Sequence, residues 1–206
     1  LVVVSWFTPK YRQKAARLRQ SCRKFSITCD VVSVSADAVT AAGSFQSFKV
    51  AFILSKLIEH GNRIVYVDAD MVIEAPIQQL VPRRFPKKGP NHHPDAGFFN
   101  WRMGLPQHPP TIATGTVYVA DTECARQLLL LWISAMMYGV NAAGAADDRV
   151  LSFLFEELRE EGANNEVVQR IGNGRCSFAW LPPTFLNLAS VNPTIILIVI
   201  LFGVVI

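Results

Sequence analysis

Residues 63–73 read RIVYVDADMVI, and the apolar run within them leads directly into Asp68 and Asp70. An unbroken apolar run of this kind is typical of a central parallel strand that is buried on both faces. Such strands place their ligand sites at their carboxyl ends, which is where the two aspartates lie. These residues therefore predict a parallel α/β sheet with a functional site at one edge.

The spacing of the two aspartates indicates the kind of site. Two acids two positions apart on an extended strand end point their carboxylates to the same side. A hard divalent ion such as Mg²⁺ takes few protein carboxylates and completes its shell with substrate phosphates. The alternative is a loop whose acids cap a helix. Residues 71–76 favour the metal, because they continue hydrophobic structure and do not open a helix.

Composition restricts the class of protein. The 206 residues suffice for one domain with a sizeable core, and 50% hydrophobic with 17% charged residues excludes a disordered chain. The net charge of +4 suits an anionic small ligand or an acidic membrane surface. It is too small and too scattered to indicate nucleic acid. The four cysteines show no metal-binding spacing and are too few for a disulfide scaffold, so we expect mostly core thiols, with a bridge between Cys22 and Cys29 as the one alternative.

Strands and helices alternate before the aspartates. Strands are expected at residues 1–4 and 31–34, and helices at 10–25 and 47–60, with Thr8 as a cap before the first helix and Gly61 ending the second. Residues 35–44 are expected to form a loop, and Ile58 to lie on the buried stripe of the second helix. The alternation predicts βαβ units. Seven basic residues of the first helix are interpreted as a solvated face: Lys10, Arg12, Lys14, Arg17, Arg19, Arg23 and Lys24.

The second half of the chain is less regular. Residues 82–110 predict a long excursion with one strand at 96–100, and they include His92 and His93, whose adjacent side chains point in different directions. A strand at 111–119 contains an isolated glycine, Gly115, which marks a bulge or a close approach of a ligand or another backbone. Helices are expected at 121–137 and from Asp147, and a short strand at 178–180.

Two features near the end of the chain leave alternatives open. Asp147 is placed to cap the helix that it opens, whereas its neighbour Asp148 is the better candidate for contact with a polar ligand. Residues 193–206 are almost purely apolar but fall short of the ~20 residues that a membrane helix needs. We place the domain at residues 1–190. The tail that follows, residues 191–206, is expected to be a buried final strand, a truncated membrane segment or sequence outside the domain.

The order of these parts resembles the nucleotide-diphospho-sugar transferases with the GT-A glycosyltransferase fold, the group that includes glycosyltransferase families 8 and 77. The resemblance covers about residues 1–190, and its most specific element is the Asp-x-Asp at a strand end. The other matching features are the cluster after the first strand, the Phe48-Lys49 helix start, the TGT strand of residues 114–116, the helix ending near Trp132, the acids Asp147-Asp148, and WLPPTFLN at 180–187.

The resemblance implies a single α/β domain with a mostly parallel central sheet flanked by helices, and a sugar transfer from a UDP- or GDP-sugar to a hydroxyl of a glycan, protein or lipid. It implies a Mn²⁺ or Mg²⁺ cofactor. By this resemblance, Asp68 and Asp70 hold the metal, and Asp68 also contacts the ribose or donor sugar. The base and ribose pocket is lined by Ser5, Trp6, Phe7 and Thr8, Lys49 lies near the diphosphate or sugar, and Thr114 and Gly115 form the floor near the sugar. Asp147 or Asp148 is the catalytic base if the enzyme inverts configuration, and positions hydroxyls if it retains configuration.

The sequence departs from the family in one respect. Many relatives supply a further metal ligand, commonly a histidine, near the end of the domain, whereas residues 193–206 contain no His, Asp or Glu. Either His92 or His93 would then supply the missing metal ligand, or water would fill its position, or the activity would be impaired. The alternatives are therefore a catalytically impaired nucleotide-sugar-binding domain and a membrane-tethered interaction module that depends on the tail. A nucleotidyltransferase would normally show a Gly-rich loop after the first strand, and residues 5–9 are not one.

Overall fold

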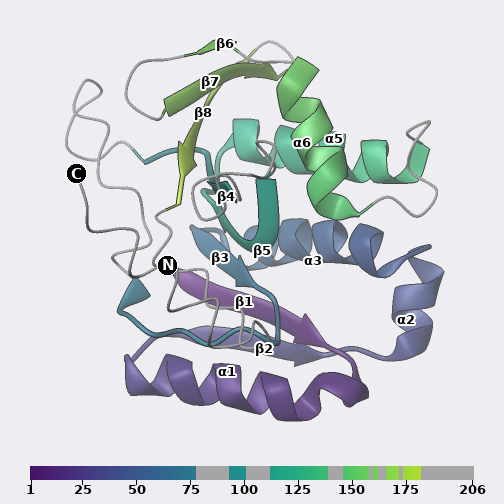
Figure 1. Cartoon of the computed structure of the whole chain (residues 1–206), viewed down its shortest axis with the longest axis vertical. Coiled ribbons are helices and arrows are strands. Elements are labelled where there is room, and N and C mark those ends of the chain that lie inside the picture. Colours follow the sequence, from purple (N-terminus) through teal and green to yellow (C-terminus); the bar gives the residue numbers. More distant parts are fainter. Residues whose placement is uncertain are drawn as a thin grey trace, which may run out of the picture.

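The computed structural model describes residues 1–77, 93–100, 112–138, 146–157, 160–161, 166–171 and 174–181. These contain one eight-stranded sheet in the order β2-β1-β3-β5-β4-β8-β7-β6 (Figure 1). The strands are β1 (Val2–Phe7), β2 (Cys29–Ser33), β3 (Ile64–Val67), β4 (Ala96–Asn100), β5 (Ile112–Val119), β6 (Glu160–Glu161), β7 (Glu166–Ile171) and β8 (Gly174–Trp180).

The sheet is parallel in its amino-terminal part and mixed in the rest. Strands β2, β1 and β3 are parallel, as the alternation of strands and helices predicted, and so are β4 and β8. Strand β5 runs antiparallel to both of its neighbours, β3 and β4, and β7 runs antiparallel to β8 and β6. The predicted α/β architecture is confirmed, and the insertion of β5 beside β3 is what brings Gly115 to the aspartates.

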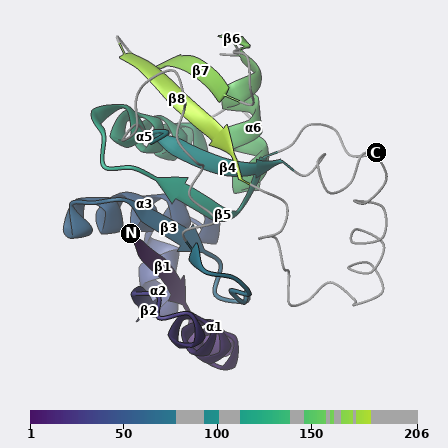
Figure 2. The ribbon, with the colours of Figure 1, turned by 90° about the vertical axis from the view of Figure 1, so that its left-hand side faces the viewer.

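Helices cover both faces of the sheet. They are η1 (Pro9–Tyr11), α1 (Arg12–Lys24), α2 (Ala36–Ala41), α3 (Phe45–His60), α5 (Glu123–Tyr138) and α6 (Asp147–Glu157). Helix α1 packs in one hydrophobic core with Val3 and Val65, whereas α3, α5 and α6 share the core on the other face with Val4 and Tyr66. Figures 1 and 2 show β1 lying between α1 and α3.

Local capping explains where the helices begin and end, and it corrects two expectations. Ser35 Oγ accepts a hydrogen bond from the Ala38 N–H, so α2 forms where a loop was expected. Ser44 caps α3 in the same way, through the Ser47 N–H, and Gly61 ends it with a φ of +54°. Thr8 precedes η1, but its side chain makes no capping hydrogen bond.

The buried face of α3 runs through Lys49, Ile53 and Leu57. Ile58, which was expected on that face, lies outside it and is 59% exposed.

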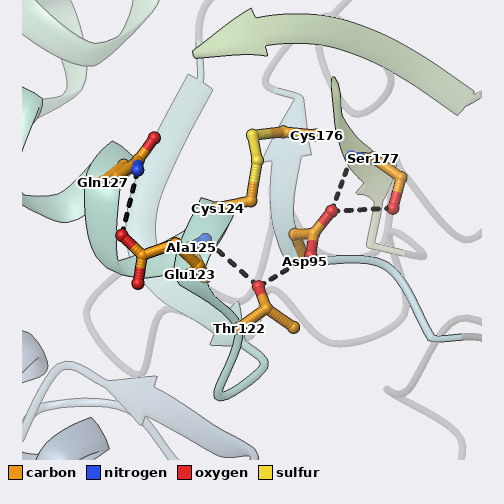
Figure 3. Close-up of a disulfide and its surroundings, with 8 residues drawn as sticks. All are labelled: Asp95, Thr122, Glu123, Cys124, Ala125, Gln127, Cys176 and Ser177. Atoms are coloured by element: carbon orange, nitrogen blue, oxygen red, sulfur yellow. Dashed lines mark hydrogen bonds between the residues drawn. A yellow bond between two sulfur atoms is a disulfide. The ribbon is translucent and has the colours of Figure 1, made fainter. Parts of the chain in front are cut away.

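A disulfide between Cys124 and Cys176 joins the first turn of α5 to β8 (Figure 3). The expectation of core thiols is therefore wrong for these two cysteines, and it holds for Cys22, which is a buried free thiol; Cys29 is free and half-buried. The pairing of Cys124 with Cys176 has no local signal in the sequence, because only the fold brings α5 beside β8. Asp95 adds a second link at this point by accepting hydrogen bonds from the Thr122 hydroxyl and the Ser177 N–H, each at 2.7 Å.

Several predictions fall on residues outside the described ranges. His92 and the whole apolar tail, residues 191–206, are among them, so the three interpretations of the tail stay predictions. In the described part of the chain, none of the helices has both the length and the apolar character that crossing a bilayer requires.

Candidate active site

Asp68 and Asp70 lie in a turn at the carboxyl end of β3. The Asp68 N–H donates to the Gly115 carbonyl at 2.9 Å, and the Met71 N–H donates to the Asp68 carbonyl at 3.0 Å. Residues 68–76 form no helix. The interpretation of these acids as helix caps is therefore wrong, and their predicted position at the strand end is confirmed.

The two carboxylates turn toward helices on opposite faces of the sheet. Asp68 Oδ1 lies 3.3 Å from Lys49 Nζ of α3, whereas Asp70 Oδ2 lies 3.5 Å from Lys14 Nζ of α1. Their predicted orientation to the same side assumed an extended backbone through both residues. The turn at Ala69 and Asp70 ends that extended backbone, and the pair spans the edge of the sheet instead.

Lys49 is the centre of a buried polar cluster. Its Nζ lies 2.8 Å from Asp147 Oδ2, 3.3 Å from Asp68 Oδ1 and 3.2 Å from Thr114 Oγ1. The Thr114 hydroxyl in turn donates to Asp147 Oδ2 at 2.7 Å. The cluster thus joins α3, the end of β3, β5 and the start of α6, four segments that are distant in sequence.

Burial and charge pairing have opposing effects on the pKa values in this cluster. Burial acts to lower the pKa of Lys49, but the carboxylates of Asp68 and Asp147 outweigh it, and its pKa is raised. Burial acts to raise the pKa of Asp147, and here the ammonium and the Thr114 hydroxyl prevail, so its pKa is lowered. Burial raises the pKa of Asp68 above its ordinary value in spite of Lys49 and Tyr66. Asp147 is thus held as a carboxylate.

Tyr66 is a site residue that the sequence analysis missed. Its hydroxyl donates to Asp68 Oδ1 at 2.7 Å, and its ring lies 5.3 Å from Lys49 Nζ. Burial, followed by the charge of Asp68, raises the pKa of Tyr66 well above its ordinary value, so the hydroxyl keeps its proton and remains a donor. The signal was present in the sequence, because residues two apart on a strand lie on one face.

Gly115 is required by a close approach. A Cβ on this residue would lie 2.6 Å from Met71 Cε and 3.3 Å from Asp68 Oδ2. The predicted bulge is confirmed, because the β4–β5 register jumps from Val117 to Ala113 and leaves residues 114–116 out of the pairing with β4. The backbone of Asp68 also approaches Gly115 closely, through its N–H. A side chain here would press on the carboxylate oxygen of Asp68 that faces away from Lys49.

Asp147 and Asp148 lie at the start of α6, and their carboxylates have different partners. Asp147 is the first residue of α6, and its carboxylate contacts Lys49 and Thr114 at the site. The carboxylate of Asp148 accepts a hydrogen bond from the Arg149 N–H at 2.7 Å, at the helix end itself. The first turn of α6 aims Asp147, and not its neighbour, at α3. The contact of Asp148 with a polar ligand stays a prediction, and the geometry favours Asp147 for that role.

The residues expected to line a base and ribose pocket lie at the carboxyl end of β1, but their side chains lie on both faces of the sheet. Trp6 packs in the core beside α3, in contact with Phe45 and Phe48, whereas Phe7 belongs to the core beside α1. Ser5 and Thr8 are also less than a tenth exposed. Within the described residues, Ser5 Oγ and Trp6 Nε1 have no hydrogen-bond partner. Their role in nucleotide binding stays a prediction.

The other candidate ligands lie away from the aspartates. His93 contacts Arg63 at 2.6 Å, at the opposite end of β3 from Asp68, so it is not positioned to complete a metal site there. Asp30, Glu59 and His60 are the one group of three potential ligands that the described ranges bring together. Lys56 Nζ lies 2.7 Å from both Asp30 and Glu59, and we interpret the group as an ion-pair network.

The carboxylates at the end of β3 are of the kind that a hard divalent cation takes, although Asp68 and Asp70 turn to opposite faces of the sheet. Of the described residues, none donates to Asp68 Oδ2, and Asp70 has only the partly exposed Lys14 as a partner. Carboxylate oxygens that remain available in this way are the ligands that Mg²⁺ and Mn²⁺ prefer. The chemistry of the donor set therefore agrees with the metal expected from the sequence.

Comparison with solved structures identifies the fold. A glycosyltransferase involved in glycosylation of the major capsid of PBCV-1 has a TM-score of 0.59 at 14% identity, over 90% of this chain and 83% of that one. The galactosyltransferase LgtC, in complex with donor and acceptor sugar analogs, has a TM-score of 0.50 at 10% identity, over 95% and 81%. GlyE of Streptococcus pneumoniae TIGR4 has a TM-score of 0.51 at 9% identity, over 88% of this chain and 45% of GlyE.

These likenesses agree with the resemblance found in the sequence. No protein-family model matches the chain, and no curated protein matches it by sequence. Identities of this size establish the fold, and the proteins that share it here are glycosyltransferases. The chain has the GT-A glycosyltransferase fold.

Proposed function

We propose that this protein is a metal-dependent glycosyltransferase that moves a sugar from a UDP- or GDP-sugar to a hydroxyl of a glycan, protein or lipid acceptor. The observation that carries the proposal is the joining of the Asp-x-Asp turn to the Lys49 cluster, at the carboxyl edge of a GT-A sheet. A fold alone does not determine function, and this constellation supplies the chemical argument.

Asp68 and Asp70 are the residues that would hold Mn²⁺ or Mg²⁺. When bound, the ion neutralises charge on the departing nucleoside diphosphate. Gly115 keeps space beside Asp68 Oδ2, while Tyr66 and Lys49 fix Oδ1. Asp68 therefore presents one oxygen to the ligand in a defined direction.

Asp147 orients a sugar hydroxyl in this proposal. A general base works best with a pKa near the operating pH, and the pKa of Asp147 is lowered. Such a carboxylate accepts a hydrogen bond from a hydroxyl but removes its proton poorly. This supports positioning, the role expected for a retaining enzyme, over proton abstraction by Asp147. Asp148 has no place in the cluster.

The test is hydrolysis of UDP-, GDP- and CMP-sugars with and without Mn²⁺. The proposal requires release of the nucleoside diphosphate from a UDP- or GDP-sugar only when the ion is present, and loss of that release in Asp70→Ala. Binding of UDP with Mn²⁺ but no turnover of any donor would favour the nucleotide-sugar-binding domain without activity. Absence of any Mn²⁺-dependent nucleotide binding would overturn both.

A further inference from the structure

Lys49 lies beside Asp68, and Lys14 lies beside Asp70. The two lysines differ in how many N–H donors their ammonium groups have free for a ligand. An ammonium has three N–H donors. Lys49 has three oxygen partners, on Asp68, Asp147 and Thr114, and its side chain is 9% exposed. Lys49 therefore has no donor left for a ligand unless one of these contacts breaks.

Lys14 is in the opposite situation. Its side chain is 45% exposed, and Nζ lies 3.5 Å from Asp70 Oδ2 and 5.1 Å from the centre of the Tyr11 ring. Exposed ion pairs of this kind contribute little to stability. A divalent ion on Asp70 would readily take the place of the ammonium, and the flexible side chain would stay within reach of whatever the ion binds.

The charges of the described residues around the aspartates favour a further cation beside a bound diphosphate. Asp68, Asp70 and Asp147 carry three negative charges, and Lys49 offsets one of them. A divalent ion offsets the other two, so that the charges counted here sum to zero and the ion is the one group among them that attracts an anionic diphosphate. Among the described residues, Lys14 is the cation next to the Asp-x-Asp turn that still has donors to offer.

We propose that Lys14 contacts the diphosphate of the donor, and that Lys49 acts only by holding Asp68 and Asp147 in place. The inference rests on the proposed function, since it assumes a nucleoside diphosphate at Asp70. It changes the role expected for Lys49, and it takes Lys14 out of the solvated face to which the sequence pattern assigned it.

The chain offers a matched control. Lys24 lies on the same helix, is exposed and stands over the Phe25 ring at 5.1 Å, as Lys14 does over Tyr11. Of these two lysines, Lys14 alone has an aspartate partner within the described ranges. Lys14→Gln and Lys24→Gln therefore remove the same charge from equivalent surroundings, while Lys14→Arg keeps the charge at the site.

Two calorimetric titrations on the full chain separate a ligand contact from a structural role. In saturating Mn²⁺, we expect Lys14→Gln to bind UDP about fivefold more weakly than the unchanged protein, the size typical of one partly exposed ionic contact. Titrated with Mn²⁺ alone, the same variant is expected to bind the ion at least as tightly, because no ammonium competes for Asp70. Lys24→Gln should match the unchanged protein in both, and Lys14→Arg should retain UDP affinity within about twofold.

The outcomes separate this inference from the proposed function. If the unchanged protein binds neither UDP nor GDP with Mn²⁺, the proposed function fails and takes this inference with it. If the unchanged protein binds and Lys14→Gln behaves as Lys24→Gln does, Lys14 is not a diphosphate contact and only this inference is overturned. Equal weakening of Mn²⁺ and UDP in Lys14→Gln would also overturn it, because that pattern indicates damage to the turn.

Discussion

Lys49 Nζ and Asp147 Oδ2 lie 2.8 Å apart, and this ion pair connects α3 to the first residue of α6. Both side chains are largely shielded from water, with 9% and 13% of their surface exposed. The same lysine also binds Asp68. A contact that stabilises the packing of two helices is thus also the contact that orients the acids of the proposed site.

Replacement of Asp147 by Asn should destabilise the protein by about 2–3 kcal/mol at pH 7, since it removes one partner of a buried ion pair. The pKa of Asp147 is lowered by folding, so its contribution is complete above the unfolded value of about 3.9 and is lost as pH falls through the folded value. The difference in free energy of unfolding between the two proteins should therefore shrink below about pH 4. Urea unfolding at several pH values measures it.

Asp148→Asn is the control for that variant, because among the described residues the Asp148 carboxylate meets only the N–H of Arg149. We expect both its stability and its donor hydrolysis to remain near those of the unchanged protein. A larger loss of hydrolysis in Asp148→Asn than in Asp147→Asn would contradict the assignment of the two residues.

Asp70→Ala should remove Mn²⁺-dependent UDP binding without unfolding the protein. The side chain is 32% exposed and has one ionic contact, at 3.5 Å, so its loss should change the free energy of unfolding by no more than about 0.5 kcal/mol. Calorimetry with UDP and Mn²⁺ and a thermal melt of the same sample measure the two quantities. Unchanged Mn²⁺-dependent binding in this variant would remove the basis of the metal assignment.

Gly115→Ala should weaken Mn²⁺ binding by about tenfold, because the added methyl group meets Met71 Cε and Asp68 Oδ2. Gly97→Ala in β4 is the matched control, since its Cβ would lie 2.9 Å from Leu181 Cδ2 in the core. Both variants should lose about 1–3 kcal/mol of stability from overpacking. Only Gly115→Ala should lose metal affinity, and equal metal affinities in the two variants would argue against a role of β5 in the site.

The disulfide should stabilise the fold by about 4 kcal/mol, from the chain-entropy estimate for a sequence separation of 52 residues. Reduction should lower the melting temperature of the unchanged protein and have no effect on the double variant Cys124→Ala, Cys176→Ala. Thiol titration of the unfolded, unreduced chain should find the two thiols of Cys22 and Cys29. Four titratable thiols in protein purified without reductant would contradict the bridge.

The parts of the fold that the sequence predicted are those with local signals. The apolar run of β3, the Gly61 that ends α3 and the amphipathic pattern of α5 each identify an element from neighbouring residues. The order of β5 and β4 in the sheet has no such signal, because it depends on which strand pairs with β3. The cap at Ser35 was a readable local signal, and the small residues around it concealed a short helix.

The candidate site also contains residues that a local sequence pattern predicts and residues that only the fold brings together. Asp68 and Asp70 were predicted as metal ligands from their spacing at a strand end, a local pattern, and their position at that strand end is confirmed. The choice between Asp147 and Asp148, the part of Lys14 and the pairing of Cys124 with Cys176 all depend on contacts between segments far apart in the chain. A basic residue on a polar helix face looks the same in sequence whether it meets water or an aspartate.

The hydrogen bond from the Asp68 N–H to the carbonyl of Gly115 has a consequence for how the protein matures. A nascent chain that has emerged only as far as this turn already carries both aspartates, yet the strand that holds the backbone of Asp68 has still to be synthesised. Nucleotide capture should thus appear late, when the second half of the polypeptide has docked. A fluorescent UDP analogue would then report completed folding of the whole domain during refolding experiments.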